Sequence, residues 1–85
     1  MSAALTNIAA DMEIEIGKAS PPIAGVLKFF RFQHLIDRAP DLAAVSSEFA
    51  TLAVSTARRS SNAETTVALR KLLEAKDAGV RAVIP

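Results

Sequence analysis

The 85-residue sequence contains no cysteine and only one histidine. Without cysteine the chain can form neither a disulfide nor a thiolate metal site, and a single histidine leaves mainly carboxylates as metal ligands. We therefore expect no metal and no cofactor. Domains of this size bury a modest core and are usually reinforced by disulfides, a metal or oligomerisation. Oligomerisation is the reinforcement that remains, so we expect the chain to self-associate.

An excess of charge of one sign is also missing. Lysine and arginine number 10 against 9 acidic residues, which gives a net charge of +1 at pH 7. A general DNA-binding protein normally carries a basic excess or a basic stripe, so we expect no DNA partner, although a small basic pocket is compatible with this balance. No apolar run approaches the ~20 residues that span a bilayer, and the N-terminus lacks the pattern of a signal peptide. We expect a cytosolic protein without a membrane partner.

Hydrophobic periodicity predicts helices in the first half of the chain. Apolar side chains in residues 2–18 fit one helical face, whereas residues 12–16 also alternate like a strand; we prefer the helix because its pattern is longer and has more anchors. Pro21 and Pro22 end this segment, since proline cannot continue the helical hydrogen-bond ladder. The apolar and aromatic residues 23–40 are interpreted as a short helix or an irregular arm.

The second half of the chain predicts a helical hairpin. Pro40 suits the first turn of a helix that should run to about Arg59. Ser61 and Glu64 have the spacing of a capping box, so we expect Ser61 to cap a final helix that reaches about Val83. Because the connection is short, the two helices should be antiparallel neighbours. The predicted fold class is all-α: a small helical protomer with a long antiparallel helical hairpin, assembled into a homo-oligomer.

Two residues of the final helix need an explanation. Lys76 lies in the middle of the apolar face, and burying an ammonium group is costly unless it is paired. Either its stem packs while the charge snorkels to the helix edge or joins an internal ion pair, which we favour, or the charge contacts a ligand or another subunit. Gly79 costs up to ~1 kcal/mol relative to alanine in a helix interior, unless a close backbone approach uses it.

The first helix of the hairpin carries a second stripe, made mostly of small side chains. Small residues let two backbones approach closely, so the stripe indicates another partner helix. That partner is either the N-terminal segment or, as we favour, another subunit. The stripe consists of Ala43, Ser47, Ala50, Val54 and Ala57.

No catalytic set is visible in the sequence. There is no nucleophile-elbow sequence and no glycine-rich phosphate loop before a helix. His34 is more often a packed or capping residue than a catalytic base. Arg70 and Arg81 have carboxylates one turn away, so they form either a solvated salt-bridge face or a phosphate contact. Residues 29–34 mix aromatic rings with a cation, which suits either a core or stacked bases. We expect no enzyme, and anion or nucleotide binding instead.

Three segments carry a resemblance to a known family. Residues 29–35, 45–53 and 64–82 read FFRFQHL, VSSEFATLA and ETTVALRKLLEAKDAGVRA, and the last of them is the specific one. Together they resemble the small bacteriophage anti-CBASS sponge proteins, which sequester the cyclic oligonucleotide signals of bacterial antiviral immunity. On this basis we divide the chain into an N-terminal extension, residues 1–22, and a helical sponge-like domain, residues 23–85.

The resemblance implies a homohexamer in the cytoplasm of the infected bacterial host. Such a protein binds cyclic dinucleotides, and in several members also cyclic trinucleotides at separate sites, without hydrolysing them, and so blocks CBASS signalling. The resemblance places Phe32 against a nucleobase and Ser47 where relatives often carry a phosphate-binding lysine or arginine. The other expected ligand-binding residues are His34, Lys28, Arg31, Arg70, Lys76 and Arg81. The alternative is a helical protein-interaction module that docks a host protein through the small-residue stripe.

Overall fold

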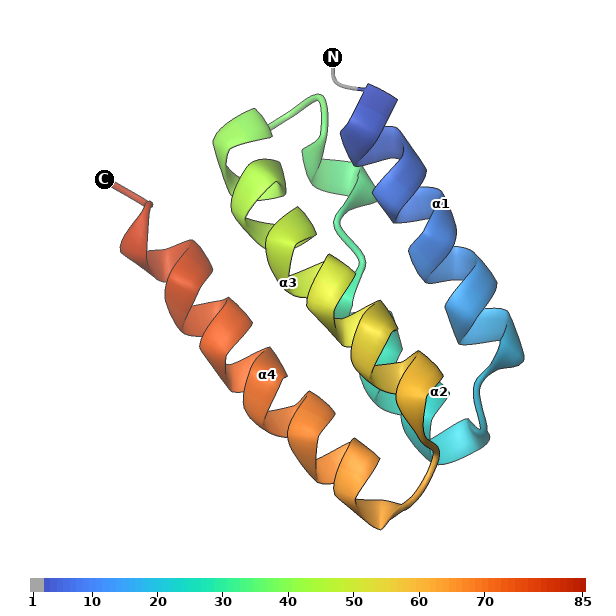
Figure 1. Ribbon diagram of the computed structural model, residues 1–85. Helices are drawn as coiled ribbons and strands as arrows, with labels where there is room; N and C mark the ends of the chain where they lie inside the picture. Colours follow the sequence, from blue (N-terminus) through green and yellow to red (C-terminus); the bar gives the residue numbers. More distant parts are fainter. Residues whose placement is uncertain (1–2) are drawn as a thin grey trace.

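The computed structural model describes residues 3–85, and this part of the chain is all-helical, as predicted (Figure 1). The strand-like alternation of residues 12–16 is therefore part of a helix. Two 3-10 turns, Lys28–Phe30 and Gln33–Leu35, lie between the second and third α-helices. The α-helices are α1 (Ala3–Lys18), α2 (Pro21–Leu27), α3 (Pro40–Arg59) and α4 (Ala63–Ala82). Within residues 3–85, no helix combines the length and hydropathy that a membrane span requires.

Helix α3 lies between α1 and α4 (Figure 1). It contacts both of these helices and also the two 3-10 turns. Its small-residue stripe is buried within the protomer: Ala43 and Ala50 are fully buried, and Ser47 and Val54 are 5% exposed. The stripe therefore finds its partners inside the chain. This is the alternative that the sequence analysis placed second, and a further subunit is not needed to cover these side chains.

One hydrophobic core joins all four α-helices to the aromatic segment, residues 28–36, that follows α2. Its largest fully buried side chains are each less than 2% exposed, and burial of one such side chain contributes roughly 1.5–3 kcal/mol. They come from α1, α2, the aromatic segment and α4: Met12, Leu27, Phe30, Phe32 and Leu69. Met12 belongs to the predicted extension, and the boundary after residue 22 falls inside α2. The division into an extension and a domain stays a prediction.

Asn62 caps α4, and the predicted cap at Ser61 is wrong by one residue. The Asn62 side-chain oxygen accepts a hydrogen bond from the backbone N–H of Thr65 at 3.1 Å. Asparagine and serine are about equally good N-cap residues, so the local sequence offered both Ser61 and Asn62 as the cap of α4. Because the helix begins at Ala63, Asn62 is the residue placed to reach Thr65.

Gly79 lies where α4 comes close to α3. A Cβ at this position would be 3.0 Å from Phe49 Cε2, which is tighter than ordinary van der Waals contact. It would also lie 3.8 Å from Val45 Cγ1. The glycine therefore makes room for the Phe49 side chain of α3.

Replacement of Asn62 by alanine should lower the free energy of unfolding by about 1 kcal/mol, because Thr65 loses the side-chain acceptor of the cap and its N–H keeps only the Asn62 backbone carbonyl. Ser61→Ala removes a hydroxyl one residue earlier and should change stability little. Urea denaturation of both variants measures the difference. A larger loss of unfolding free energy for Ser61→Ala than for Asn62→Ala would show that Ser61 is the capping residue.

Gly79→Ala should gain less than the ~1 kcal/mol that alanine offers in a helix, because the Phe49 ring must move to admit the methyl group. In a Phe49→Leu background the ring is absent, so the same substitution should stabilise the protein more. A double-mutant cycle measured by denaturation gives the coupling between the two positions. Equal effects of Gly79→Ala in both backgrounds would contradict the contact.

Candidate anion-binding site

An open cleft of about 560 Å³ lies between the segment that follows α2 and the C-terminal half of α4. Its lining combines four cations and a histidine with one carboxylate, and we call it the basic cleft. Of the eight ligand-binding residues predicted from the sequence, the fold brings five together here. The lining consists of Lys28, Phe29, Arg31, His34, Leu35, Ser46, Lys76, Asp77, Val80 and Arg81.

Local geometry explains why these residues converge. In the turn Lys28–Phe30 the Phe30 ring enters the core, which leaves Lys28 and Phe29 exposed on the other sides of the turn. On α4, residues four apart lie one above the other, so Lys76 is followed by Val80 and Asp77 by Arg81 on adjacent strips of the helix surface. One wall of the cleft is thus set by a buried phenylalanine and the other by helical spacing.

Lys76 is the half-buried cation of this cleft. Its side chain is 17% exposed, and its Nζ lies 3.0 Å from Oδ1 of Asp77. The structure thus shows the ion pair of the favoured alternative, with the neighbouring residue of the helix as partner. The ammonium group also lines the basic cleft, and its contact with a ligand stays a prediction.

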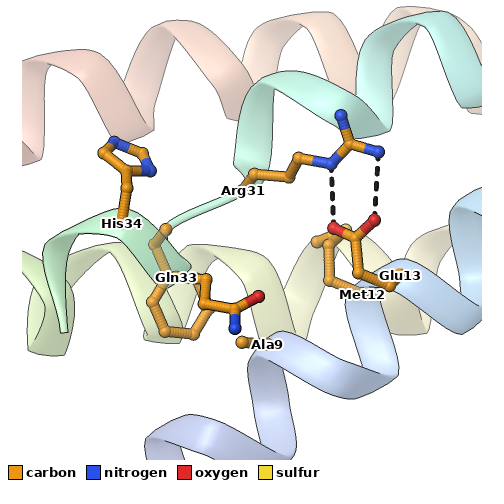
Figure 2. Close-up of a pocket in the computed structure, with 7 residues that line it drawn as sticks. Ala9, Met12, Glu13, Arg31, Gln33 and His34 are labelled. Carbon is orange, nitrogen blue, oxygen red and sulfur yellow. Dashed lines mark hydrogen bonds and ion pairs between the residues drawn. The ribbon is translucent and has the colours of Figure 1, made fainter.

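Arg31 lies between the basic cleft and a second hollow of about 410 Å³ beside α1. Glu13 of α1 holds its guanidinium with two hydrogen bonds: Nε donates to Oε2 at 2.8 Å, and Nη2 donates to Oε1 at 3.0 Å (Figure 2). These hydrogen bonds, and then the charge of Glu13, raise the pKa of Arg31 above its ordinary value. Figure 2 shows the third guanidinium nitrogen pointing away from Glu13, so Arg31 is oriented by α1 and keeps donors for another partner.

Three predicted site residues lie outside the basic cleft. Phe32 is 1% exposed and belongs to the core, and it lines the hollow beside α1 together with Arg31 and His34. Ser47 is 5% exposed, and its hydroxyl donates to the carbonyl oxygen of Ala44 at 2.7 Å. Arg70 lines a different hollow, near the start of α4. Phe32 was expected to stack on a base and Ser47 to lie at a phosphate-binding position, and neither residue lies in the basic cleft.

The sequence analysis missed Phe29 as a site residue. Phe29 is 57% exposed, and Lys28 Nζ lies 5.4 Å from the centroid of its ring. The available signal was the run of neighbouring phenylalanines, since a single short turn cannot bury every ring of such a run. Which ring stays outside depends on the turn itself, and the sequence pattern does not specify that geometry.

The arrangement is suited to binding phosphates. Arginine offers a forked set of donors to phosphate oxygens, and lysine offers a compact point charge. Within residues 3–85, no three potential metal-ligating side chains come together to hold a metal ion. Comparison with protein-family models, curated proteins and solved structures finds no match to this chain. Function must therefore be inferred from the basic cleft and from the sequence.

Asp77→Asn should strengthen the binding of pyrophosphate to the basic cleft. Among the described residues, Asp77 supplies the one carboxylate of the lining. A unit charge at 4 Å in water contributes about 1 kcal/mol, so the expected gain in affinity is about five-fold. The matched control is Glu74→Gln, which removes a carboxylate from the same helix outside the cleft. Isothermal titration calorimetry at low ionic strength compares the variants, and equal affinities would contradict an anion site here.

Proposed function

We propose that this protein is a non-enzymatic sponge that sequesters cyclic dinucleotide or trinucleotide immune signals and so blocks CBASS signalling in the infected host's cytoplasm. The observation that carries the proposal is the convergence of four cations in one cleft: Lys28, Arg31, Lys76 and Arg81. A cyclic oligonucleotide presents two or three phosphates on a compact ring, and several cations recognise such a ligand better than one. Sequestration requires affinity and no catalytic group, and the cations of this cleft offer charge to the ligand's phosphates.

The resemblance to the sponge family supports the same proposal. Its most specific segment, residues 64–82, contains Lys76 and Arg81, which line the cleft. The burial of Phe32 and Ser47 changes the expected ligand contacts. We therefore assign the phosphates to the cations of the basic cleft.

We further propose that the protein assembles into a homo-oligomer, with the hexamer implied by the resemblance as the expected form. Its protomer would be built on the antiparallel hairpin of α3 and α4. Several large apolar side chains outside the basic cleft remain exposed and would contribute to subunit contacts: Ile14, Leu52, Val67, Val83 and Ile84. Because the basic cleft is open in one protomer, a neighbouring subunit would enclose more of the ligand surface.

A second candidate function is a helical module that inhibits a host protein. Exposed large apolar side chains would supply the contacts of such a module. The small-residue stripe, through which we expected docking, is buried beneath other parts of the same chain. A docking surface would therefore use exposed side chains such as Leu52 and Val67.

The deciding experiment is isothermal titration calorimetry with a panel of cyclic dinucleotides and trinucleotides. Lys76→Ala should weaken binding at least ten-fold, because a hydrogen bond to a charged group contributes about 1.5–3 kcal/mol. The matched control is Lys71→Ala, which removes the same charge from an exposed position of α4 outside the cleft. Chromatography of the released ligand should recover the nucleotide intact.

Two outcomes would redirect the assignment. If no nucleotide of the panel binds and a host protein co-purifies stoichiometrically, the interaction module becomes the better explanation. If Lys76→Ala dissociates the oligomer, as measured by light scattering, Lys76 serves assembly and not the ligand.

A further inference from the structure

Phe29 is an aromatic ring that the fold places in the basic cleft and leaves outside the core. It is 57% exposed, whereas Phe30 and Phe32 are each 1% exposed. Consecutive side chains of a 3-10 turn point in directions roughly 120° apart, so the insertion of Phe30 into the core turns Phe29 outward. The exposure of Phe29 is thus a fixed consequence of the turn.

Cations lie around this ring. Lys28 Nζ is 5.4 Å from the ring centroid, and Lys76 and Arg81 line the same cleft. Anions without a ring, such as pyrophosphate, would use these cations and leave Phe29 without a role. A nucleotide uses both features, because its base stacks on an aromatic face while its phosphate binds the neighbouring positive charges.

We infer that Phe29 is the surface on which a nucleobase of the bound ligand stacks. The inference rests on the proposed function and deepens it, since it names the base-binding residue of the basic cleft and moves that role from the buried Phe32 to Phe29. A phenyl ring has no hydrogen-bonding group. Stacking on Phe29 therefore selects for a nucleotide over other anions but discriminates weakly between bases.

The absence of tryptophan and tyrosine from the sequence makes a direct test available. Phe29→Trp introduces one indole fluorophore, whose emission should be quenched when cyclic di-AMP or cyclic tri-AMP stacks on it. The matched control is Glu48→Trp, at an exposed position of α3 outside the cleft. Saturable quenching in the Phe29 variant, with none in the Glu48 variant, is the expected result, and pyrophosphate should quench neither.

Phe29→Ala provides the affinity measurement. Calorimetry should show a loss of about five-fold to a hundred-fold for the cyclic nucleotide, as expected for one stacked base, with pyrophosphate affinity unchanged. Thermal unfolding should be unaltered, because the side chain is largely outside the core.

The possible failures are distinguishable. If the wild-type protein binds the cyclic nucleotide and Phe29→Ala binds it equally well, the stacking role is wrong and the proposed function stands. If the wild-type protein binds neither cyclic nucleotide, both proposals fail. If Phe29→Ala changes the oligomeric state in light scattering, the ring is a subunit contact, and the stacking inference is overturned.

Discussion

The burial of Phe30 and Phe32 is the interaction on which the rest of the structure depends. The segment between α2 and α3 has only short 3-10 turns, so its own hydrogen bonds hold it weakly. The two rings fix it by entering a core that also includes Met12 of α1 and Leu69 of α4. Their burial turns Lys28, Phe29 and Arg31 outward. The polar wall of the basic cleft is thus positioned by apolar packing behind it.

The sequence predicted those features that local chemistry decides. Pro40 and Arg59 bound α3 as expected, and α4 differs from its predicted limits by about one residue. Features decided by tertiary contact were missed. Nothing in a run of phenylalanines shows which ring faces outward, and the Glu13–Arg31 pair joins residues 18 positions apart. The basic residues of the cleft were found because charge is visible in a sequence, whereas exposure of an aromatic ring is not.

A chain with a net charge of +1 can carry a locally basic site because its charges are unevenly placed. Two carboxylates of α1 are each bound by an arginine: Glu13 by Arg31, and the buried Glu15 by Arg58 at 2.9 Å. The Glu13 pair offsets one cation of the basic cleft, whereas the Glu15 pair involves an arginine outside it. The α4 side of the basic cleft retains more cations than carboxylates. Total charge was the basis for expecting no DNA partner, but it does not describe this local imbalance.

The bidentate contact between Glu13 and Arg31 has a thermodynamic consequence. Arg31 belongs at once to the attachment of α1 and to the lining of the basic cleft. Consider a ligand that binds Arg31 more tightly when Glu13 holds the guanidinium. If docking of α1 increases the affinity for this ligand by some factor, linkage requires that the ligand stabilise the docking of α1 by the same factor. The N-terminal helix would then report occupancy of the cleft: its backbone amides would exchange with solvent more slowly once the cleft is filled.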